Sequence, residues 1–182
     1  KSTLLHCMSG VLTPDSGEVV FESTNIAALD DAARSSLRLN HFGFIFQDGQ
    51  LLPELTATEN VALPQIMRGV SRKEAHEQAD DMLTRLGLGN FTNRFPGQLS
   101  GGQAQRVGVA RGLVNKPDIL IMDEPFGAVD PVVRRSLQNE IVELREKFDT
   151  TILIVSHDID EAFFLGDTVV ILGERARIEQ AD

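Results

Sequence analysis

Two features in the middle of the sequence have the residue types and spacing of a phosphate site. Ser100 can cap the start of a helix, and the two glycines after it leave the first backbone N–H groups of that helix bare. An anion could rest there, against the positive end of the helix dipole. Further along, residues 119–122 predict a buried strand that ends at Asp123 and Glu124. Open α/β sheets bind ligands at the carboxyl ends of their strands, so these carboxylates could take part in phosphate chemistry.

The stretch that contains both features resembles a known family. Residues 99–130, LSGGQAQRVGVARGLVNKPDILIMDEPFGAVD, resemble the signature motif, Walker B strand and D-loop of ABC-type ATPases, and a Ser-His-Asp triplet follows at residues 156–158. Each motif alone could be a flexible turn or a solvated strand end, but their joint occurrence is specific. The resemblance implies an α/β P-loop NTPase fold, with a mostly parallel central sheet flanked by helices and an inserted helical subdomain.

The first three residues, Lys1, Ser2 and Thr3, resemble the end of a Walker A loop. In such a loop the backbone N–H groups surround the phosphates, the lysine reaches the β- and γ-phosphates, and the hydroxyl binds Mg²⁺. We therefore expect residues 1–182 to be one ABC ATPase domain that is incomplete at its N-terminus and, as it stands, inactive.

Composition is compatible with an enzyme of a reducing compartment. The chain has 182 residues, of which 42% are hydrophobic, and no apolar run approaches the ~20 residues of a membrane span. Its net charge of −10 argues against a general nucleic-acid surface. Cys7 is the only cysteine, which excludes an internal disulfide, and we expect its side chain in the core.

Apolar periodicity predicts the elements that position the motifs. Residues 56–67 and 71–86 have the spacing of two helices, the second with a capping box formed by Ser71 and Glu74. We expect residues 48–98 to form the helical subdomain and residues 99–115 the signature helix. Within the subdomain, Leu51, Leu52, Pro53 and Leu55 either contact a membrane partner, as the resemblance implies, or close the subdomain core.

The remaining segments alternate between helices and strands. Residues 18–21, 41–47, 150–155 and 168–172 have the pattern of strands, and the β-branched stretch 150–155 predicts a central parallel strand. Residues 30–39 predict a short helix capped by Asp30 or Asp31, Pro131 suits the first turn of a long helix, and residues 158–165 predict a further short helix.

The resemblance also implies how ATP and Mg²⁺ are held. Lys1 would neutralise the β- and γ-phosphate oxygens, with Thr3 beside it in the nucleotide-binding loop. Ser2 would coordinate Mg²⁺, and Asp123 would hold the same ion through a water. Gln47, at the end of the strand over residues 41–47, would be the Q-loop residue that touches both Mg²⁺ and the attacking water.

The remaining roles concern hydrolysis and dimerisation. Glu124 would act as general base on the attacking water, and His157 would bind the γ-phosphate and keep that water aligned. The signature residues Ser100, Gly101, Gly102 and Gln103 would cap ATP on a second subunit in a head-to-tail dimer. Asp130, in the D-loop, would couple the two sites.

Two branches of the family share this resemblance. Residues 1–90 resemble the ATPases of lipoprotein-releasing and macrolide-export systems, and residues 91–182 resemble those of glycine betaine and other osmoprotectant importers. We expect a bacterial ABC transporter subunit on the inner face of the cell membrane, paired with a second ATPase subunit and transmembrane permease subunits, and with a substrate-binding protein if it imports. The alternatives are a non-transport ABC ATPase acting on DNA or the ribosome, and a non-hydrolysing remnant.

Overall fold

A computed structural model describes residues 1–46, 49–127, 131–147, 150–173 and 178–181. The helices of these residues are α1 (Ser2–Met8), α2 (Asp31–His41), α3 (Ala57–Met67), α4 (Arg72–Arg85), α5 (Gly101–Leu113), α6 (Pro131–Lys147) and α7 (Ile159–Leu165), with short 3-10 turns η1 (Ile26–Ala28) and η2 (Pro96–Gln98). The strands are β1 (Val20–Phe21), β2 (Thr24–Asn25), β3 (Phe42–Phe46), β4 (Ile119–Asp123), β5 (Thr151–Val155), β6 (Val170–Leu172) and β7 (Ile178–Ala181).

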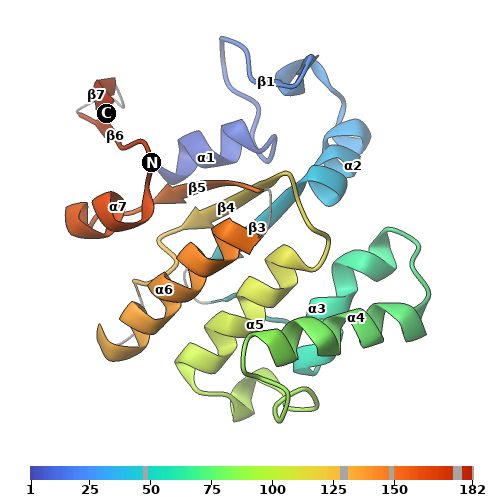
Figure 1. The fold of residues 1–182 in the computed structure, drawn as a ribbon. Coiled ribbons are helices and arrows are strands. Elements are labelled where there is room, and N and C mark those ends of the chain that lie inside the picture. Colours follow the sequence, from blue (N-terminus) through green and yellow to red (C-terminus); the bar gives the residue numbers. More distant parts are fainter. Residues whose placement is uncertain (47–48, 128–130, 148–149, 174–177, 182) are drawn as a thin grey trace.

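Three parallel strands form the sheet that positions the motifs, in the order β3-β4-β5. Helix α1 lies on one face of this sheet, and α5 and α6 lie on the other (Figure 1). The middle strand, β4, is buried over Leu120, Ile121 and Met122, which agrees with the predicted buried strand. Among the described residues β5 pairs only with β4, so the prediction that β5 is central to the sheet is wrong for the described part of the chain.

Alternation along β4 divides the hydrophobic core between the two faces of the sheet. Leu120 and Met122 belong to the larger cluster, which continues through α5 and α6 to α3 and α4. Ile121 belongs to the smaller cluster, where it packs with Leu5 of α1 and Phe42 of β3. Because successive strand residues point to opposite faces, one strand anchors helices on both sides.

Helix α5 approaches β3 closely because neither carries a side chain at the point of contact. A Cβ atom on Gly43 would lie 2.2 Å from the carbonyl oxygen of Gly112, a distance that no real Cβ could keep. Glycine at Gly43 therefore lets the signature helix pack directly on the strand that leads to residue 47.

Helices α3 and α4 pack against each other and against α5. At the start of α3, Thr56 and Glu59 form a complete capping box. The capping box predicted for α4 is only half formed, because Ser71 accepts from the backbone N–H of Glu74 whereas the Glu74 carboxylate accepts from Gln78 instead. The division of residues 48–98 as a separate subdomain stays a prediction.

The structure also tests two smaller predictions from the sequence, the cap of α2 and the burial of Cys7. Asp30 is the cap of α2 and accepts from the backbone N–H of Ala33 at 2.8 Å. Cys7 is half-buried, so the prediction that its side chain lies in the core is wrong.

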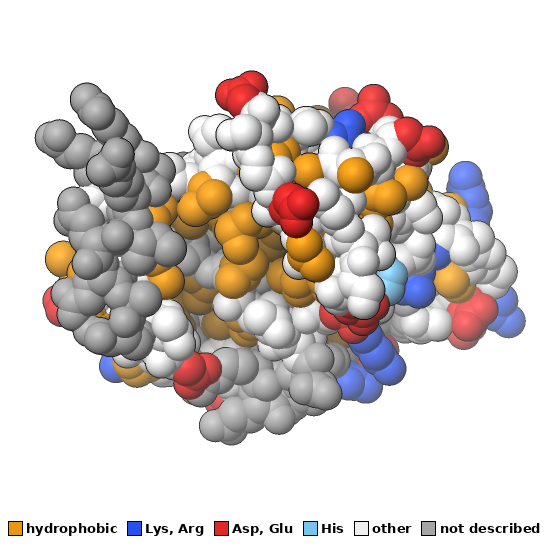
Figure 2. Space-filling view, turned by 90° about the horizontal axis from the view of Figure 1, so that it is seen from above, with side chains coloured by type: hydrophobic (Ala, Val, Ile, Leu, Met, Phe, Trp, Pro, Cys, Tyr) orange, Lys and Arg blue, Asp and Glu red, His pale blue; other side chains and the backbone are white. Residues whose placement is uncertain are grey.

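Seen from the α1 side, hydrophobic side chains gather at the surface (Figure 2), and Leu4 and Val20 are among the exposed ones. None of the helices in the described ranges is both long enough and apolar enough to traverse a membrane.

Candidate functional site

The carboxyl ends of the three parallel strands lie side by side. Asp123 ends β4 and pairs in register with Phe46 of β3 and Val155 of β5. The residues that follow β4 and β5, Glu124 and Ser156, are therefore neighbours at the same edge of the sheet. This is the edge at which open α/β sheets bind ligands.

The start of α1 lies over this edge and is held there by two side chains. The Ser2 hydroxyl donates to Oδ1 of Asp123 at 3.0 Å, and Lys1 Nζ donates to the carbonyl oxygen of Ser156 at 2.8 Å. Thr3 is exposed in the first turn of the same helix. Residues more than a hundred positions apart are thus brought together, as the Walker A resemblance implied.

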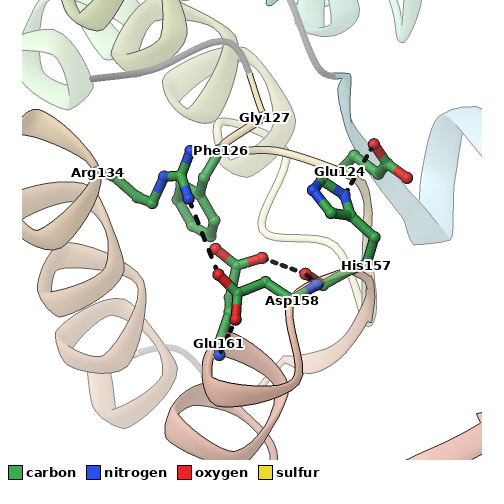
Figure 3. Close-up of a pocket in the computed structure, with 8 residues that line it drawn as sticks. Glu124, Phe126, Gly127, Arg134, His157, Asp158 and Glu161 are labelled. Atoms are coloured by element: carbon green, nitrogen blue, oxygen red, sulfur yellow. Dashed lines mark hydrogen bonds and ion pairs between the residues drawn. The ribbon is translucent and has the colours of Figure 1, made fainter. Parts of the chain in front are cut away.

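Glu124 and His157 face each other across the ends of β4 and β5. Nδ1 of His157 lies 3.3 Å from Oε2 of Glu124, and both side chains reach solvent (Figure 3). Glu124 has a positive φ of 46°, an uncommon conformation for a residue other than glycine. Its backbone N–H donates to the carbonyl oxygen of Val155 at 2.9 Å, which fixes the turn to the neighbouring strand. The strained turn aims the carboxylate at the histidine.

A buried carboxylate supports the turn that carries His157. Glu161 of α7 is 6% exposed, and its two oxygens accept from the Ser156 hydroxyl and, at 2.9 Å, from Nε2 of Gln138. The Ser156 hydroxyl oxygen also accepts from the backbone N–H of Asp158 at 3.0 Å. This network joins α6, α7 and the turn after β5, so the position of His157 depends on side chains outside the predicted motifs.

A small pocket opens beside these groups (Figure 3). Three carboxylates, an imidazole and a guanidinium line it, and Arg134 points toward Asp158 with 3.9 Å between Nη1 and Oδ2. The lining comprises Glu124, Phe126, Gly127, Arg134, Ser156, His157, Asp158 and Glu161.

The signature residues lie elsewhere. The start of α5 is well separated from the start of α1 in Figure 1. Ser100 and Gln103 form a reciprocal capping box, with 2.8 Å from Ser100 N to Gln103 Oε1 and 3.3 Å from Gln103 N to Ser100 Oγ. The predicted cap at Ser100 is therefore confirmed, and it uses the N–H group of Gln103. Space is open around the Cα of Gly101, and Gly102 follows it in the first turn of α5.

Two predicted site residues, Gln47 and Asp130, lie outside the described residues.

Two of the supporting side chains, those of Gln138 and Glu161, were not predicted from the sequence. Glu161 follows the helix cap Asp158 by three residues, a spacing that indicates helix capping and nothing else. Its burial and its bond to Ser156 arise only from the packing of α6 and α7 against the strand end.

Comparisons with known proteins identify a matching family and several similar proteins. A family model described as ABC transporter matches residues 1–127. The trimethylamine N-oxide transport system ATP-binding protein of Pelagibacter ubique is 41% identical over 182 residues, covering 100% of this chain and 53% of that protein. The glycine betaine/proline betaine transport system ATP-binding protein of Escherichia coli is 38% identical over 184 residues, covering 100% of this chain and 46% of that protein. The chain thus spans about half the length of these relatives.

A relative from the other predicted branch and a solved structure match as well. The lipoprotein-releasing system ATP-binding protein of Bacteroides fragilis is 41% identical over 158 residues, 87% of this chain and 73% of that protein. A dimeric ATP-binding cassette in a post-hydrolysis state bound to ADP and Pi superimposes with a TM-score of 0.88 at 35% identity, covering 100% of this chain and 79% of that chain. The predicted fold class, a P-loop NTPase cassette, is confirmed.

Proposed function

Because this chain belongs to the ABC transporter family, we propose that it binds and hydrolyses ATP as the nucleotide-binding part of a bacterial transporter. The observation that carries the proposal is the meeting of three pairs at one sheet edge. These are Lys1 with the carbonyl of Ser156, Ser2 with Asp123, and Glu124 with His157. Phosphoryl transfer to water uses a cation on the phosphates, oxygen ligands for a metal ion and a group that orients the attacking water. The three pairs supply an ammonium group, a hydroxyl with a carboxylate, and a carboxylate next to an imidazole.

The Ser2–Asp123 pair fits a magnesium ion. Mg²⁺ prefers oxygen ligands and is commonly held by one or two protein groups together with substrate phosphates. The hydroxyl and the carboxylate already lie 3.0 Å apart. When bound there, Mg²⁺ would neutralise charge on the phosphate oxygens. The further proposed ligand, Gln47, lies outside the described residues.

The remaining residues act on ATP and water. Lys1 exchanges the Ser156 carbonyl for the β- and γ-phosphate oxygens. Glu124 accepts a proton from water as the water oxygen bonds to the γ-phosphorus, the bond from that phosphorus to the bridging oxygen breaks, and ADP leaves with the electron pair. His157 faces Glu124 through Nδ1 and the γ-phosphate through its other ring nitrogen, which holds base and substrate together.

The separation of the signature residues supports a head-to-tail dimer. Ser100, Gly101, Gly102 and Gln103 lie away from Lys1 within one chain, so we propose that they cap ATP bound to a second subunit, with Asp130 between the two sites. The structural relative bound to ADP and Pi is itself dimeric.

Transport coupling is proposed from the relatives. Those described above are named as ATP-binding proteins of transport or releasing systems, which does not favour the alternative of a DNA- or ribosome-acting ATPase. We propose that the chain works on the inner face of the membrane with permease subunits, in the import direction of the osmoprotectant branch. Co-purification of the full-length protein with a multi-span membrane protein tests this point, and co-purification with ribosomes or DNA would contradict it.

The test of the chemistry is Glu124→Gln in the full-length protein. Glutamine keeps the shape of the side chain but cannot accept the proton, so we expect ATP binding to persist and turnover to fall about 100-fold or more. The variant should also accumulate as an ATP-bound dimer in light scattering. Glu77→Gln, a matched change at an exposed glutamate of α4, serves as control. An unchanged rate of phosphate release would remove Glu124 from the mechanism.

A further inference from the structure

One buried amide on α5 bonds to the backbone beside two strand ends of the candidate site. Gln105 is 2% exposed, and its Nε2 donates to the carbonyl oxygen of Pro125 at 2.7 Å and to that of Phe46 at 3.3 Å. Pro125 directly follows Glu124, and Phe46 is the last residue of β3. Since a side-chain amide carries two N–H donors, this one group can serve both carbonyls.

The same face of α5 contacts the backbone that follows β3 over a further turn and a half of the helix. A Cβ atom on Gly108 would lie 3.1 Å from Cα of Gly49, so helix and loop touch with no side chain between them. Arg111 then donates to the carbonyl oxygens of Gly49 at 2.7 Å and Gln50 at 2.9 Å. Gln105, Gly108 and Arg111 follow one another at intervals of three residues and so lie along one side of the helix.

Glu124 is therefore held from two sides. Its own N–H is bonded to Val155 of β5, and the next carbonyl along the chain is bonded to Gln105 of α5. If the α5 bond were lost, the turn that gives Glu124 its positive φ would keep its bond to β5 and its own internal bond from the Gly127 N–H to the Glu124 carbonyl, but it would lose this hydrogen bond to α5. A displacement of about 1 Å in a catalytic group can cost about 100-fold in rate.

We propose that Gln105 is a positioning residue, which acts through the Pro125 and Phe46 carbonyls to set Glu124 and the chain after β3 relative to the signature helix. The proposal rests on the function proposed above, because it assigns Gln105 a part in the same hydrolysis. Any shift of α5 on dimer closure would be transmitted through this amide to the turn that bears the general base.

The test compares Gln105→Met with Gln65→Met in the full-length protein. Methionine keeps a similar volume and removes both donors. Gln65 is a matched control, since it is 5% exposed and its Nε2 also donates to a backbone carbonyl, that of Val114 at 3.2 Å, but it lies on α3. For Gln105→Met we expect kcat to fall 10- to 100-fold with KM for Mg²⁺·ATP within about threefold of wild type. For Gln65→Met we expect a similar loss of thermal stability and a kcat within about twofold.

The outcomes separate the two proposals. If the wild-type protein releases no phosphate, the proposed function fails and Gln105 has no reaction to support. If wild type is active and Gln105→Met keeps its kcat, or loses no more than Gln65→Met, the positioning role is overturned. Gln105→Glu, which is isosteric, replaces Gln105→Met if the latter does not fold. If neither variant folds, Gln105 serves stability alone and the proposal is also overturned.

Discussion

Glu59 closes the first turn of α3 and gives the protein a titratable helix cap. Its Oε2 accepts from the backbone N–H of Thr56 at 2.8 Å and from the Thr56 hydroxyl at 3.0 Å. The backbone bond, followed by the hydroxyl bond, lowers the pKa of Glu59 below its ordinary value of 4.5. The cap therefore favours the folded state whenever this carboxyl is ionised.

We expect this contribution to depend on pH in one direction. Because the folded pKa is below the unfolded one, the stabilisation is complete above the unfolded value and is lost as the pH falls through the folded value. Glu59→Gln keeps a capping side chain without a titratable group. The free energy of unfolding of wild type minus that of Glu59→Gln, measured in urea from pH 7 to pH 3, should shrink below about pH 4.5. Glu54→Gln, at an exposed position before α3, is the control, and a difference that grows on acidification would refute the assignment.

At the scale of the element, α5 has two functions. Its start carries the signature residues, and the face from Gln105 to Arg111 contacts the chain after β3. Ser100→Arg should place a long cation where the proposed partner's nucleotide would approach, and should also remove the Oγ that accepts from Gln103. We expect the full-length variant to bind ATP as a monomer but to lose hydrolysis.

Mixing subunits tests whether the proposed site is shared. A heterodimer of Ser100→Arg with Lys1→Ala contains one composite site with Lys1 and Ser100 both intact, so it should recover part of the phosphate release that each variant lacks alone. Two copies of Lys1→Ala give the baseline. If the mixture stays at that baseline, sharing across the dimer is contradicted.

How far the elements follow from the sequence depends on the range of the interactions that form them. The strand over β4 and the cap of α5 follow from local pattern, and both are present. The capping box at Ser71 has the same local pattern as the one at Thr56, yet Glu74 binds Gln78 instead. A helical neighbour competed for the carboxylate, and such competition is invisible in a four-residue motif.

The candidate site divides in the same way. The motifs indicated Asp123, Glu124 and His157, because catalytic residue types at strand ends have a strong local signature. Gln105 and Glu161 have no such signature, since an amide inside a helix and an acid in a first turn are ordinary there. Their roles come from packing between segments distant in sequence, namely α5 against β3 and α7 against the end of β5. Tertiary contacts determine the roles of Gln105 and Glu161, and the periodicity of the sequence does not reveal such contacts.

For the whole molecule, one large core cluster joins the sheet to the helical pair. Residues of α3 and α4, such as Val61 and Leu83, belong to the same cluster as Met122 of β4 and Leu137 of α6. Helix α5 contacts α3 and α4 as well as strand β3, so a movement of α3 and α4 relative to the sheet would act on α5 (Figure 1). The helix that carries the signature residues therefore also connects the pair α3 and α4 to the sheet.

The parallel register also sets an order of folding. The pair of β4 with β5 joins Ile119 to Thr151 and spans less than half the sequence that separates Phe42 from Ile119 in the pair of β3 with β4. Closing the longer loop costs at least about 0.6 kcal/mol more. The β4–α6–β5 unit should accordingly assemble before β3 joins it. In stopped-flow refolding we expect Leu137→Ala on α6 to slow folding and Val61→Ala on α3 chiefly to speed unfolding. If instead Val61→Ala slowed folding and Leu137→Ala chiefly sped unfolding, the folding nucleus would lie in α3 and α4.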